Sequence, residues 1–382
     1  MNSPHARLQV LVAHSGAELY GADRVLLESV AGLVREGAAV SVTVPGVGAL
    51  VSELERVGAT VIPCRVPVLR KSSLNPVGLL KLAGGFVAGG VRGLRLIRSV
   101  RPDAIYVNTV TIPLWPLLGK LTRIPVLVHV HEAERTAPKL LRTALALPLV
   151  CSTSIVANSR YSAETLAQAL PLLESRTTVI YNGVAGPAQL VPPRECVTAP
   201  LRLLYVGRLS GRKGVHTAIA AVAQARTLGL EVHLDVVGAV FPGYEWYAEQ
   251  LQAQVAALNL GAFVTFHGFQ RNVWKYYADA DVAIVPSCVD EPFGDTAVEA
   301  VLAARPTIVS RTPGLSEAAG GFASVQFVEA GDAGAAAAAL LRIHADWPTF
   351  RDAALADARL AAQRYSTQNY AQEIWGAVGR LP

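Results

Sequence analysis

This chain of 382 residues has few cysteines and few charged residues. The cysteines lie far apart, and no two of them form a C-x-x-C pair: Cys64, Cys151, Cys196 and Cys288. This spacing argues against a zinc site and favours a reduced, cytosolic chain. Only 16% of the residues are charged whereas 52% are hydrophobic, so the chain can form large cores, and its length suggests two or three domains.

A long uninterrupted apolar run is also missing. A transmembrane helix needs about 20 consecutive apolar residues. The nearest candidate, residues 75–101, is interrupted by Lys81, Arg92 and Arg95 and is weakened as a helix by its glycines. The opening MNSPHARLQVLVAHSG has a short apolar run without a small-residue cleavage site. We therefore expect no membrane span, no signal peptide and a cytoplasmic location.

Acidic residues are absent between Arg56 and Asp103. The interval contains eight basic residues interleaved with Leu, Val and Phe: Arg65, Arg70, Lys71, Lys81, Arg92, Arg95, Arg98 and Arg101. A basic, apolar face of this kind can bind anionic lipid, which would place the protein on the inner face of a membrane. The alternative is a solvated helix over a hydrophobic core. The net charge of +5 allows phosphate-bearing ligands or an anionic surface equally.

Short apolar runs alternate with longer helical stretches along the chain. In the first half, LQVLVA, VSVTVP, TVIPC, AIYVN, VLVHV and SIVAN lack in/out alternation, which is typical of parallel strands buried on both faces. The helical stretch that ends in Arg-Glu-Gly places Gly37 as a C-terminal stop. The pattern predicts an α/β protein of doubly wound sheets.

A proline-rich segment, residues 184–200, is expected to be a linker. The strand pattern restarts after it with LRLLYVG, VHLDVVG, FVTFHG, VAIVPS and PTIVS. We predict domains over 1–183 and 201–362, with residues 363–382 as a final helix. Ligands of such sheets bind beyond the carboxyl ends of the strands, so two facing domains would form a site in the cleft between them.

The stretch VGRLSGRKG, residues 206–214, lies where a strand ends and a helix begins. Its Ser-Gly turn can bring Arg208 and Lys213 toward one point, and such a cation pair suits a diphosphate. The alternative is a solvated basic turn.

The stretch DEPFGDTAVEA, residues 290–300, follows a strong strand. We expect Asp295 or Thr296 to cap the helix that contains Glu299. A helix start near a glycine is an anion site because its N–H groups point outward. The alternative is that neither acid binds a ligand: Glu299 would stabilise the helix dipole, and Glu291 would be an ordinary acidic residue of a loop.

His129 and His131 are two residues apart at the end of a predicted strand, so their side chains lie on the same face. Two histidines in this arrangement suggest a metal site. A third ligand at metal spacing is absent, so we favour one buried, hydrogen-bonded histidine and one that faces the cleft. The D-x-D of ADAD, residues 278–281, precedes its strand, and these acids are expected to be structural. GAELYG, residues 16–21, lacks the Lys-Ser/Thr of a P-loop.

Together these segments resemble the retaining GT4 glycosyltransferases of the GT-B fold. The resemblance rests on VGRLSGRKG, VTFHGF and VAIVPSCVDEPFGDTAVEAVLAARPTIVSRTPGLSE in the second half. In the first half it rests on YGADRVLLESVAGLVREG, IPVLVHVHE, SIVANSRYSAETL and VIYNGV, in the family's order. It implies two Rossmann-like domains facing a central cleft, an acceptor-binding first domain, a nucleotide-sugar-binding second domain and a C-terminal helix that crosses back to the first.

The resemblance also implies the roles of individual residues. Glu299 is similar to the residue that binds the ribose hydroxyls, and Glu291 to the one facing the donor sugar. Arg208 and Lys213 resemble the diphosphate clamp. The remaining positions are His131, similar to the histidine that touches the donor sugar, Gly21, similar to the glycine approaching the phosphates, and Gly294, Asp295 and Thr296, whose amides complete the cradle.

The family carries out a metal-independent transfer with retention at the anomeric carbon, from a nucleotide sugar to an acceptor. No metal and no cofactor beyond the sugar nucleotide is therefore expected. Because the first domain of the family holds the acceptor, the basic interval favours a lipid-linked acceptor in cell-surface polysaccharide or glycolipid synthesis.

The sequence departs from the family pattern at several positions. Tyr20 stands where a glycine is usual, Arg305 replaces a glycine before Pro306, and Asp295-Thr296 replaces an apolar pair. The alternatives are a nucleotide-sugar epimerase of the same fold and a non-catalytic glycosyltransferase-like subunit. A nucleic-acid binder is disfavoured because the basic residues are not interleaved with exposed aromatics. The terminal Trp375 is expected to be a packing residue.

Overall fold

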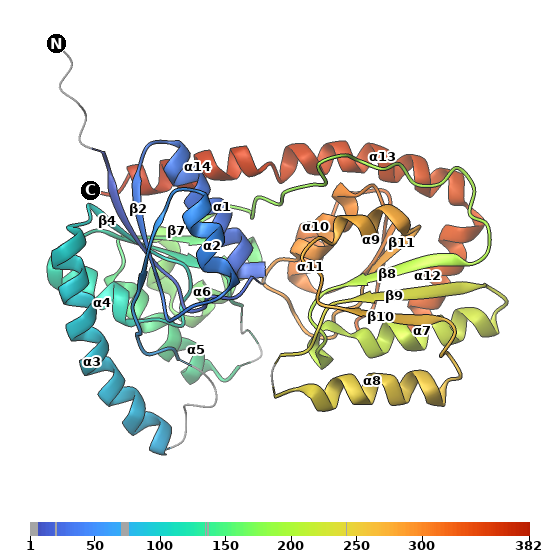
Figure 1. Ribbon diagram of the computed structural model, residues 1–382, viewed down its shortest axis with the longest axis horizontal. Coiled ribbons are helices and arrows are strands. Elements are labelled where there is room, and N and C mark those ends of the chain that lie inside the picture. Colours follow the sequence, from blue (N-terminus) through green and yellow to red (C-terminus); the bar gives the residue numbers. More distant parts are fainter. Residues whose placement is uncertain (1–6, 20, 70–75, 134, 136, 242) are drawn as a thin grey trace, which may run out of the picture. The chain divides into compact units, whose positions relative to one another are not determined.

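The computed structural model describes residues 7–19, 21–69, 76–133, 135, 137–241 and 243–382, with the backbone alone for 76–81. The chain forms two compact units (Figure 1). The first contains residues 1–183 and 367–382, and the second contains residues 184–366.

The first unit is built on a seven-stranded parallel sheet of order β3-β2-β1-β4-β5-β6-β7. Its strands are β1 (Gln9–Ala13), β2 (Ala39–Val44), β3 (Thr60–Pro63), β4 (Ala104–Val107), β5 (Val126–Val130), β6 (Ser154–Ala157) and β7 (Thr177–Val179). Its helices are α1 (Gly21–Arg35), α2 (Ala49–Arg56), α3 (Pro76–Val100), α4 (Leu114–Thr122), α5 (Lys139–Ala146), α6 (Arg160–Ala169) and α14 (Thr367–Gly379). The winding direction reverses between β1 and β4, which is the topological switch point of this sheet.

The second unit has a six-stranded parallel sheet of order β10-β9-β8-β11-β12-β13. Its strands are β8 (Leu201–Val206), β9 (Val232–Val237), β10 (Val264–Gly268), β11 (Val282–Val285), β12 (Thr307–Ser310) and β13 (Val325–Val328). Its helices are α7 (Val215–Thr227), α8 (Glu245–Ala257), α9 (Trp274–Asp279), α10 (Asp295–Leu302), α11 (Pro313–Ala319), α12 (Ala333–Ala345) and α13 (Trp347–Arg364). Here the switch point lies between β8 and β11.

Both faces of the central strands are buried, which explains their unbroken apolar runs. On β1, Val10 and Val12 belong to a core shared with α1 and α14, whereas Leu11 and Ala13 belong to a separate core with α4. Alternate residues of a strand point to opposite faces, so a strand covered on both sides must be apolar throughout. The prediction of doubly wound parallel sheets is confirmed.

The last helix, α14, packs in the first unit. Tyr370, Ile374 and Val378 are buried in the core of that unit, and Trp375 packs against it partly buried. Ala371 lies so close to Gly32 of α1 that a Cβ on Gly32 would be 2.6 Å from the Ala371 methyl carbon. The expected return of the C-terminal helix and the packing role of Trp375 are confirmed. Residues 363–364, expected in that helix, end α13 instead.

Of the other local expectations, the helix stop at Gly37 is confirmed, whereas the weakening of the helix over residues 76–100 by its glycines is not. Helix α1 ends at Arg35 and is followed by Gly37 with φ of 96°. The glycines of residues 76–100 do not interrupt α3, which runs for 25 residues. No helix among the described residues meets the length and hydropathy that a membrane span requires. Arg70 and Lys71 lie outside the described residues, as does Tyr20.

Candidate active site

In the second unit, the predicted site residues follow the two strands that flank the switch point. Arg208 and Lys213 lie after β8, and residues 291–299 lie after the neighbouring strand β11. The carboxyl end of a parallel sheet at its switch point is where such folds bind ligands. The fold therefore gathers these charged residues at one edge of the sheet.

The turn after β8 holds Arg208 by its backbone and its side chain. The hydroxyl of Tyr205 donates to the Arg208 carbonyl oxygen at 2.8 Å. The guanidinium carbon of Arg208 lies 3.6 Å from the centre of the Phe241 ring, which is cation–π geometry. Burial and the nearby carboxylate of Glu291 raise the pKa of Tyr205, so its hydroxyl stays protonated as a donor.

Gly214 brings the turn after β8 against the loop after β11. A Cβ on Gly214 would lie 1.8 Å from the carbonyl oxygen of Pro286, and its φ of 72° is in the left-handed region. The same contact is reinforced by the amide of Cys288, which donates to the carbonyl oxygen of Arg212 at 2.8 Å. Only glycine fits here, so this position fixes the approach of the two loops.

Lys213 and Glu291 form an ion pair across these loops. The Lys213 ammonium lies 2.5 Å from Glu291 Oε2, with the two side chains 30% and 13% exposed. The hydroxyl of Ser287 donates to the other carboxylate oxygen of Glu291. The structure thus joins two predicted site residues directly and adds Ser287, which the sequence reasoning missed although it ends the VAIVPS run.

The cap of α10 differs from the prediction. Its N-cap is Gly294, with φ of 150°, and no side chain caps the helix, so the expectation that Asp295 or Thr296 would do so was wrong. This φ is rarely adopted by residues with a Cβ, which explains why glycine stands here, and a Cβ would also lie 2.6 Å from Leu315 Cδ2. Glu299 is 8% exposed on α10, and the Thr296 carbonyl accepts a 3.3 Å bond from the Tyr277 hydroxyl.

The side chains of Arg305 and of Asp281 in the D-x-D segment bind other groups of the protein. Arg305 is buried and donates to the carbonyl oxygens of Tyr277 at 2.6 Å and Val191 at 2.7 Å. Burial lowers its pKa to about 10. Asp281 accepts from both the Nε and Nη2 of Arg194, at 2.8 and 2.5 Å, and this pairing occupies its carboxylate as predicted.

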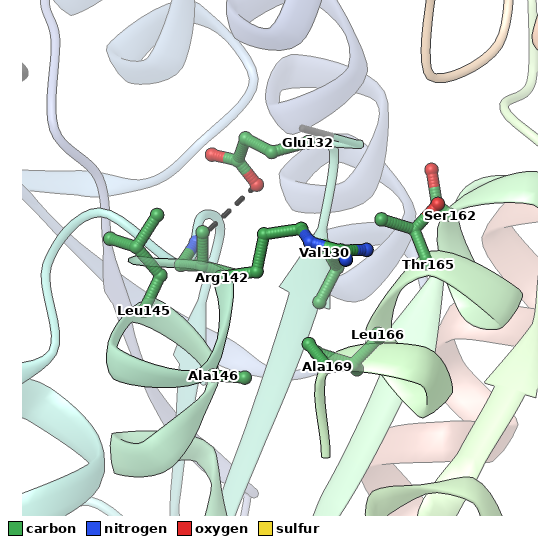
Figure 2. A pocket seen from close by; sticks show the side chains of 10 residues that line it. Val130, Glu132, Arg142, Leu145, Ala146, Ser162, Thr165, Leu166 and Ala169 are labelled. Atoms are coloured by element: carbon green, nitrogen blue, oxygen red, sulfur yellow. Dashed lines mark hydrogen bonds between the residues drawn. The ribbon is translucent and has the colours of Figure 1, made fainter. Parts of the chain in front are cut away.

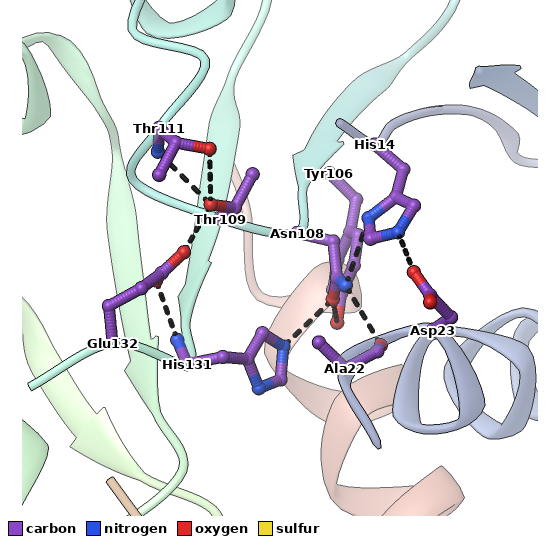
Figure 3. Close-up of polar contacts among 9 residues, drawn as sticks. All are labelled: His14, Ala22, Asp23, Tyr106, Asn108, Thr109, Thr111, His131 and Glu132. Atoms are coloured by element: carbon purple, nitrogen blue, oxygen red, sulfur yellow. Dashed lines mark hydrogen bonds and ion pairs between the residues drawn. The ribbon is translucent and has the colours of Figure 1, made fainter. Parts of the chain in front are cut away.

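In the first unit, a polar network lies beyond the carboxyl ends of β1, β4 and β5 (Figure 3). Asn108, directly after β4, is its centre. Its Oδ1 is 2.9 Å from His131 Nε2, and its Nδ2 is 3.3 Å from His14 Nδ1 and 3.4 Å from the Ala22 carbonyl oxygen. His14 Nε2 is in turn 2.6 Å from Asp23 Oδ1.

These contacts determine which ring nitrogens carry protons. An amide NH₂ donates only, so His14 Nδ1 accepts from Asn108 and its Nε2–H donates to Asp23. The amide oxygen accepts only, so His131 Nε2 carries a proton and its Nδ1 keeps a lone pair. Burial and the neighbouring His14 lower the pKa of His131 to about 3, which keeps it neutral. His131 therefore offers a hydrogen-bond acceptor.

The other histidine of the pair is part of the core. His129 is fully buried, its Nδ1 lies 2.6 Å from the Tyr106 hydroxyl, and its ring centre is 4.0 Å from that of His131. The Tyr106 hydroxyl donates to Ser29 Oγ at 3.2 Å, and Ser29 Oγ lies 2.5 Å from the Tyr370 hydroxyl of α14. Among the described residues, no group of three His, Cys, Asp or Glu side chains is placed to hold a metal.

Sequence reasoning missed His14, Asp23, Asn108 and Glu132. Glu132 accepts hydrogen bonds from the Thr109 hydroxyl, from the Val110 amide at 3.4 Å and from the His131 amide at 3.0 Å. Burial raises the pKa of Glu132. A usable signal was present, since His14 directly follows one predicted strand and Asn108 is the last residue of another. Gly21, the remaining predicted residue, is the first residue of α1 and is exposed.

Comparisons with known proteins identify both halves of the chain. A model described as "Glycosyltransferase Family 4" matches residues 20–185, and one described as "Glycosyl transferases group 1" matches residues 196–359. A glycogen synthase of Mycobacterium tuberculosis (strain H37Rv) is 36% identical over 37% of this chain and 33% of its own length. A lipopolysaccharide 1,2-N-acetylglucosaminetransferase of Salmonella typhimurium is 36% identical over 30% of this chain and 31% of its own. These matches span about a third of each relative.

Solved structures match over almost the entire chain. The Anabaena protein HepE in complex with UDP-glucose has a TM-score of 0.82 at 21% identity, covering 98% of this chain and all of that one. WaaG, a glycosyltransferase of lipopolysaccharide biosynthesis, has a TM-score of 0.71 at 14% identity, again with 98% and 100% coverage. At these identities the likeness establishes the GT-B fold of two Rossmann-like domains.

Proposed function

This chain belongs to glycosyltransferase family 4, and we propose that it transfers a sugar from a nucleotide-diphosphate sugar to a glycan or lipid-linked acceptor. The observation that carries the proposal is the gathering of Arg208, Lys213, Glu291 and Glu299 around the switch point of the second sheet. A nucleotide sugar needs cations for its diphosphate and hydroxyl acceptors at both ends, and this set supplies both.

Each group has a specific role in the proposed site. Arg208 and Lys213 offset the charge of the diphosphate, together with the amides of residues 294–296 at the start of α10. Glu299 accepts from the ribose hydroxyls and Glu291 from those of the donor sugar. In the first unit, His131 offers its Nδ1 lone pair to a hydroxyl of the donor sugar, and Gly21 allows close approach to the phosphates.

The reaction breaks the bond between the anomeric carbon and the diphosphate oxygen, whose electrons leave with the nucleoside diphosphate. A hydroxyl oxygen of the acceptor bonds to that carbon on the same face, and its proton passes to the departing diphosphate oxygen. The configuration is therefore retained. The clamp of Arg208 and Lys213 replaces a divalent cation, so the transfer needs no metal.

The identity of the donor can be tested by thermal stabilisation. HepE was crystallised with UDP-glucose, and a relative that is 26% identical over 63% of this chain is a GDP-mannose-dependent mannosyltransferase. A panel of UDP-, GDP-, ADP- and TDP-sugars should contain one donor that raises the melting temperature at concentrations where the others do not. Stabilisation by none of them would contradict the proposal. Conversion of the donor without acceptor would indicate an epimerase, and binding without turnover on any acceptor would indicate a non-catalytic subunit.

We also propose that the first unit binds the inner face of a membrane through α3. Val87 and Val91 are exposed on this helix beside the exposed Arg95 and Arg98. Apolar side chains flanked by cations suit an anionic lipid surface. The protein should co-sediment with anionic vesicles and be released by salt, and Arg95→Glu with Arg98→Glu should abolish this. Equal binding to neutral vesicles, or no binding, would overturn the idea.

A further inference from the structure

A cavity of about 50 Å³ lies in the first unit beside the polar network (Figure 2). It is lined by Val110, Val130, Glu132, Arg142, Leu145, Ala146, Ser162, Thr165, Leu166 and Ala169. These residues come from the end of β5, the loop after β4, and helices α5 and α6. A water-sized position needs about 10–15 Å³ by this measure, so the cavity has room for a small group of a few heavy atoms but not for a sugar ring.

Most polar groups of the lining already have partners. The Ser162 hydroxyl donates to Asn158 Oδ1 at 2.9 Å, and the Thr165 hydroxyl donates to the Tyr161 carbonyl at 2.7 Å. The Glu132 carboxylate accepts from a hydroxyl and two backbone amides. These groups hold the walls of the cavity in place.

Arg142 is the exception. Its Nε and Nη1 atoms are buried and have no hydrogen-bond partner. No ion pair joins Arg142 to Glu132 or to another acid in the described part of the chain. Its side chain reaches from α5 across the cavity toward α6 (Figure 2). Arg142 as a whole is half-buried, but these two donors are removed from water without a partner. Such burial is costly, and an anion alongside would offset that cost.

We propose that this cavity is a subsite for an anionic group of the acceptor, either a carboxylate or a phosphate, held by Arg142. The inference rests on the proposed function, because it assigns part of the acceptor. Charged donors bind such oxyanions with short, strong hydrogen bonds, and the apolar walls strengthen them by excluding water. Glu132 lines the cavity and bonds to the His131 amide, so the anion would lie beside the residue proposed to contact the donor sugar.

Direct binding tests the subsite without any turnover. Methyl glucuronide, glucose 6-phosphate and methyl glucoside are titrated into the full chain, with saturation-transfer NMR as the readout. We expect one of the two anionic sugars to bind at least tenfold more tightly than the neutral one, and the stronger of them identifies the anion as carboxylate or phosphate. Equal binding of all three would overturn the proposal.

Two variants test the role of Arg142, and one serves as a control. Arg142→Met should remove the preference for the anion, and Ala169→Leu should weaken anion binding by filling the cavity without changing charge. Arg35→Met, at an exposed arginine in the last turn of α1, should bind as the unaltered chain does. Unchanged anion binding by Arg142→Met and Ala169→Leu would refute the subsite. If those variants still bind a nucleotide sugar, the failure concerns the subsite alone and the proposed function stands.

Discussion

Lys213 Nζ lies 2.5 Å from Glu291 Oε2, although the two residues belong to loops that follow different strands of the second sheet. The pair holds the lysine ammonium at the switch point, next to the turn that carries Arg208. A change at either residue therefore alters the electrostatics of the other, and substitutions here test the whole clamp.

Lys213→Ala is expected to lower kcat/KM by about 10²–10³-fold, because a preorganised positive group near developing charge contributes on that scale. Steady-state kinetics with the donor found in the panel would measure it. Arg212→Ala is the matched control, since Arg212 lies in the same turn but donates to the Asp290 carbonyl at 3.4 Å. Equal losses in both variants would contradict a specific role for Lys213.

Glu299→Gln is expected to weaken nucleotide binding about 10- to 100-fold, because a hydrogen bond to a charged group contributes about 1.5–3 kcal/mol. Glu291→Ala should instead lower mainly kcat. Calorimetric titration with the nucleoside diphosphate separates the two effects. Glu249→Gln, on the exposed face of α8, is the control. Wild-type binding by Glu299→Gln would show that this carboxylate does not contact the nucleotide.

Asn108→Asp should introduce a pH dependence that the native chain lacks. Native His131, with its pKa lowered to about 3, stays neutral above about pH 4. A carboxylate in place of the Asn108 amide favours the imidazolium and raises the pKa of His131. Activity of the variant should then fall as the pH drops through the raised pKa, because the protonated ring has no acceptor at Nδ1. A pH–rate profile of kcat/KM identical to the native one would argue against this network.

The buried histidines should also make stability depend on pH. The folded-state pKa of both His129 and His131 is lowered by burial, so below the unfolded value of about 6.5 the unfolded chain binds more protons. The free energy of unfolding should therefore be highest above that pH. Below it, the free energy should fall by up to about 1.4 kcal/mol per pH unit for each histidine. Urea unfolding at pH 7, 6 and 5 measures the slope. His131→Gln should reduce it, and an unchanged slope would exclude His131 as a source.

Gly214→Ala should destabilise the second unit by about 2–4 kcal/mol, because the new Cβ meets the Pro286 carbonyl oxygen and the backbone must leave a positive φ. Gly211→Ala, in the same turn, meets no atom within 4 Å and should change stability by less than about 1 kcal/mol. Calorimetric melting compares the two. Similar melting temperatures for both variants would contradict the close approach of these loops.

The strands that the sequence predicted well are mostly apolar and buried on both faces, such as β1 and β4, because their composition reflects a constant environment. The prediction missed β7 and β13, which are edge strands of three and four residues. Their residues mix with polar neighbours, and only pairing with β6 or β12 makes them strands. The cap of α10 was missed for a similar reason, since the positive φ that the folded chain requires at residue 294 selects glycine there.

Except for β7 and β13, the sequence by itself determined the order of the strands and the charged residues at their ends, because periodicity and turn chemistry are local properties of the chain. The tertiary structure alone decided that Lys213 pairs with Glu291, that Asn108 sets the proton positions on His14 and His131, and that Arg142 extends into a cavity without a partner. These contacts join segments that are far apart in sequence. Which side chains meet depends on strand order and on close approaches such as that at Gly214, and neither leaves a local pattern.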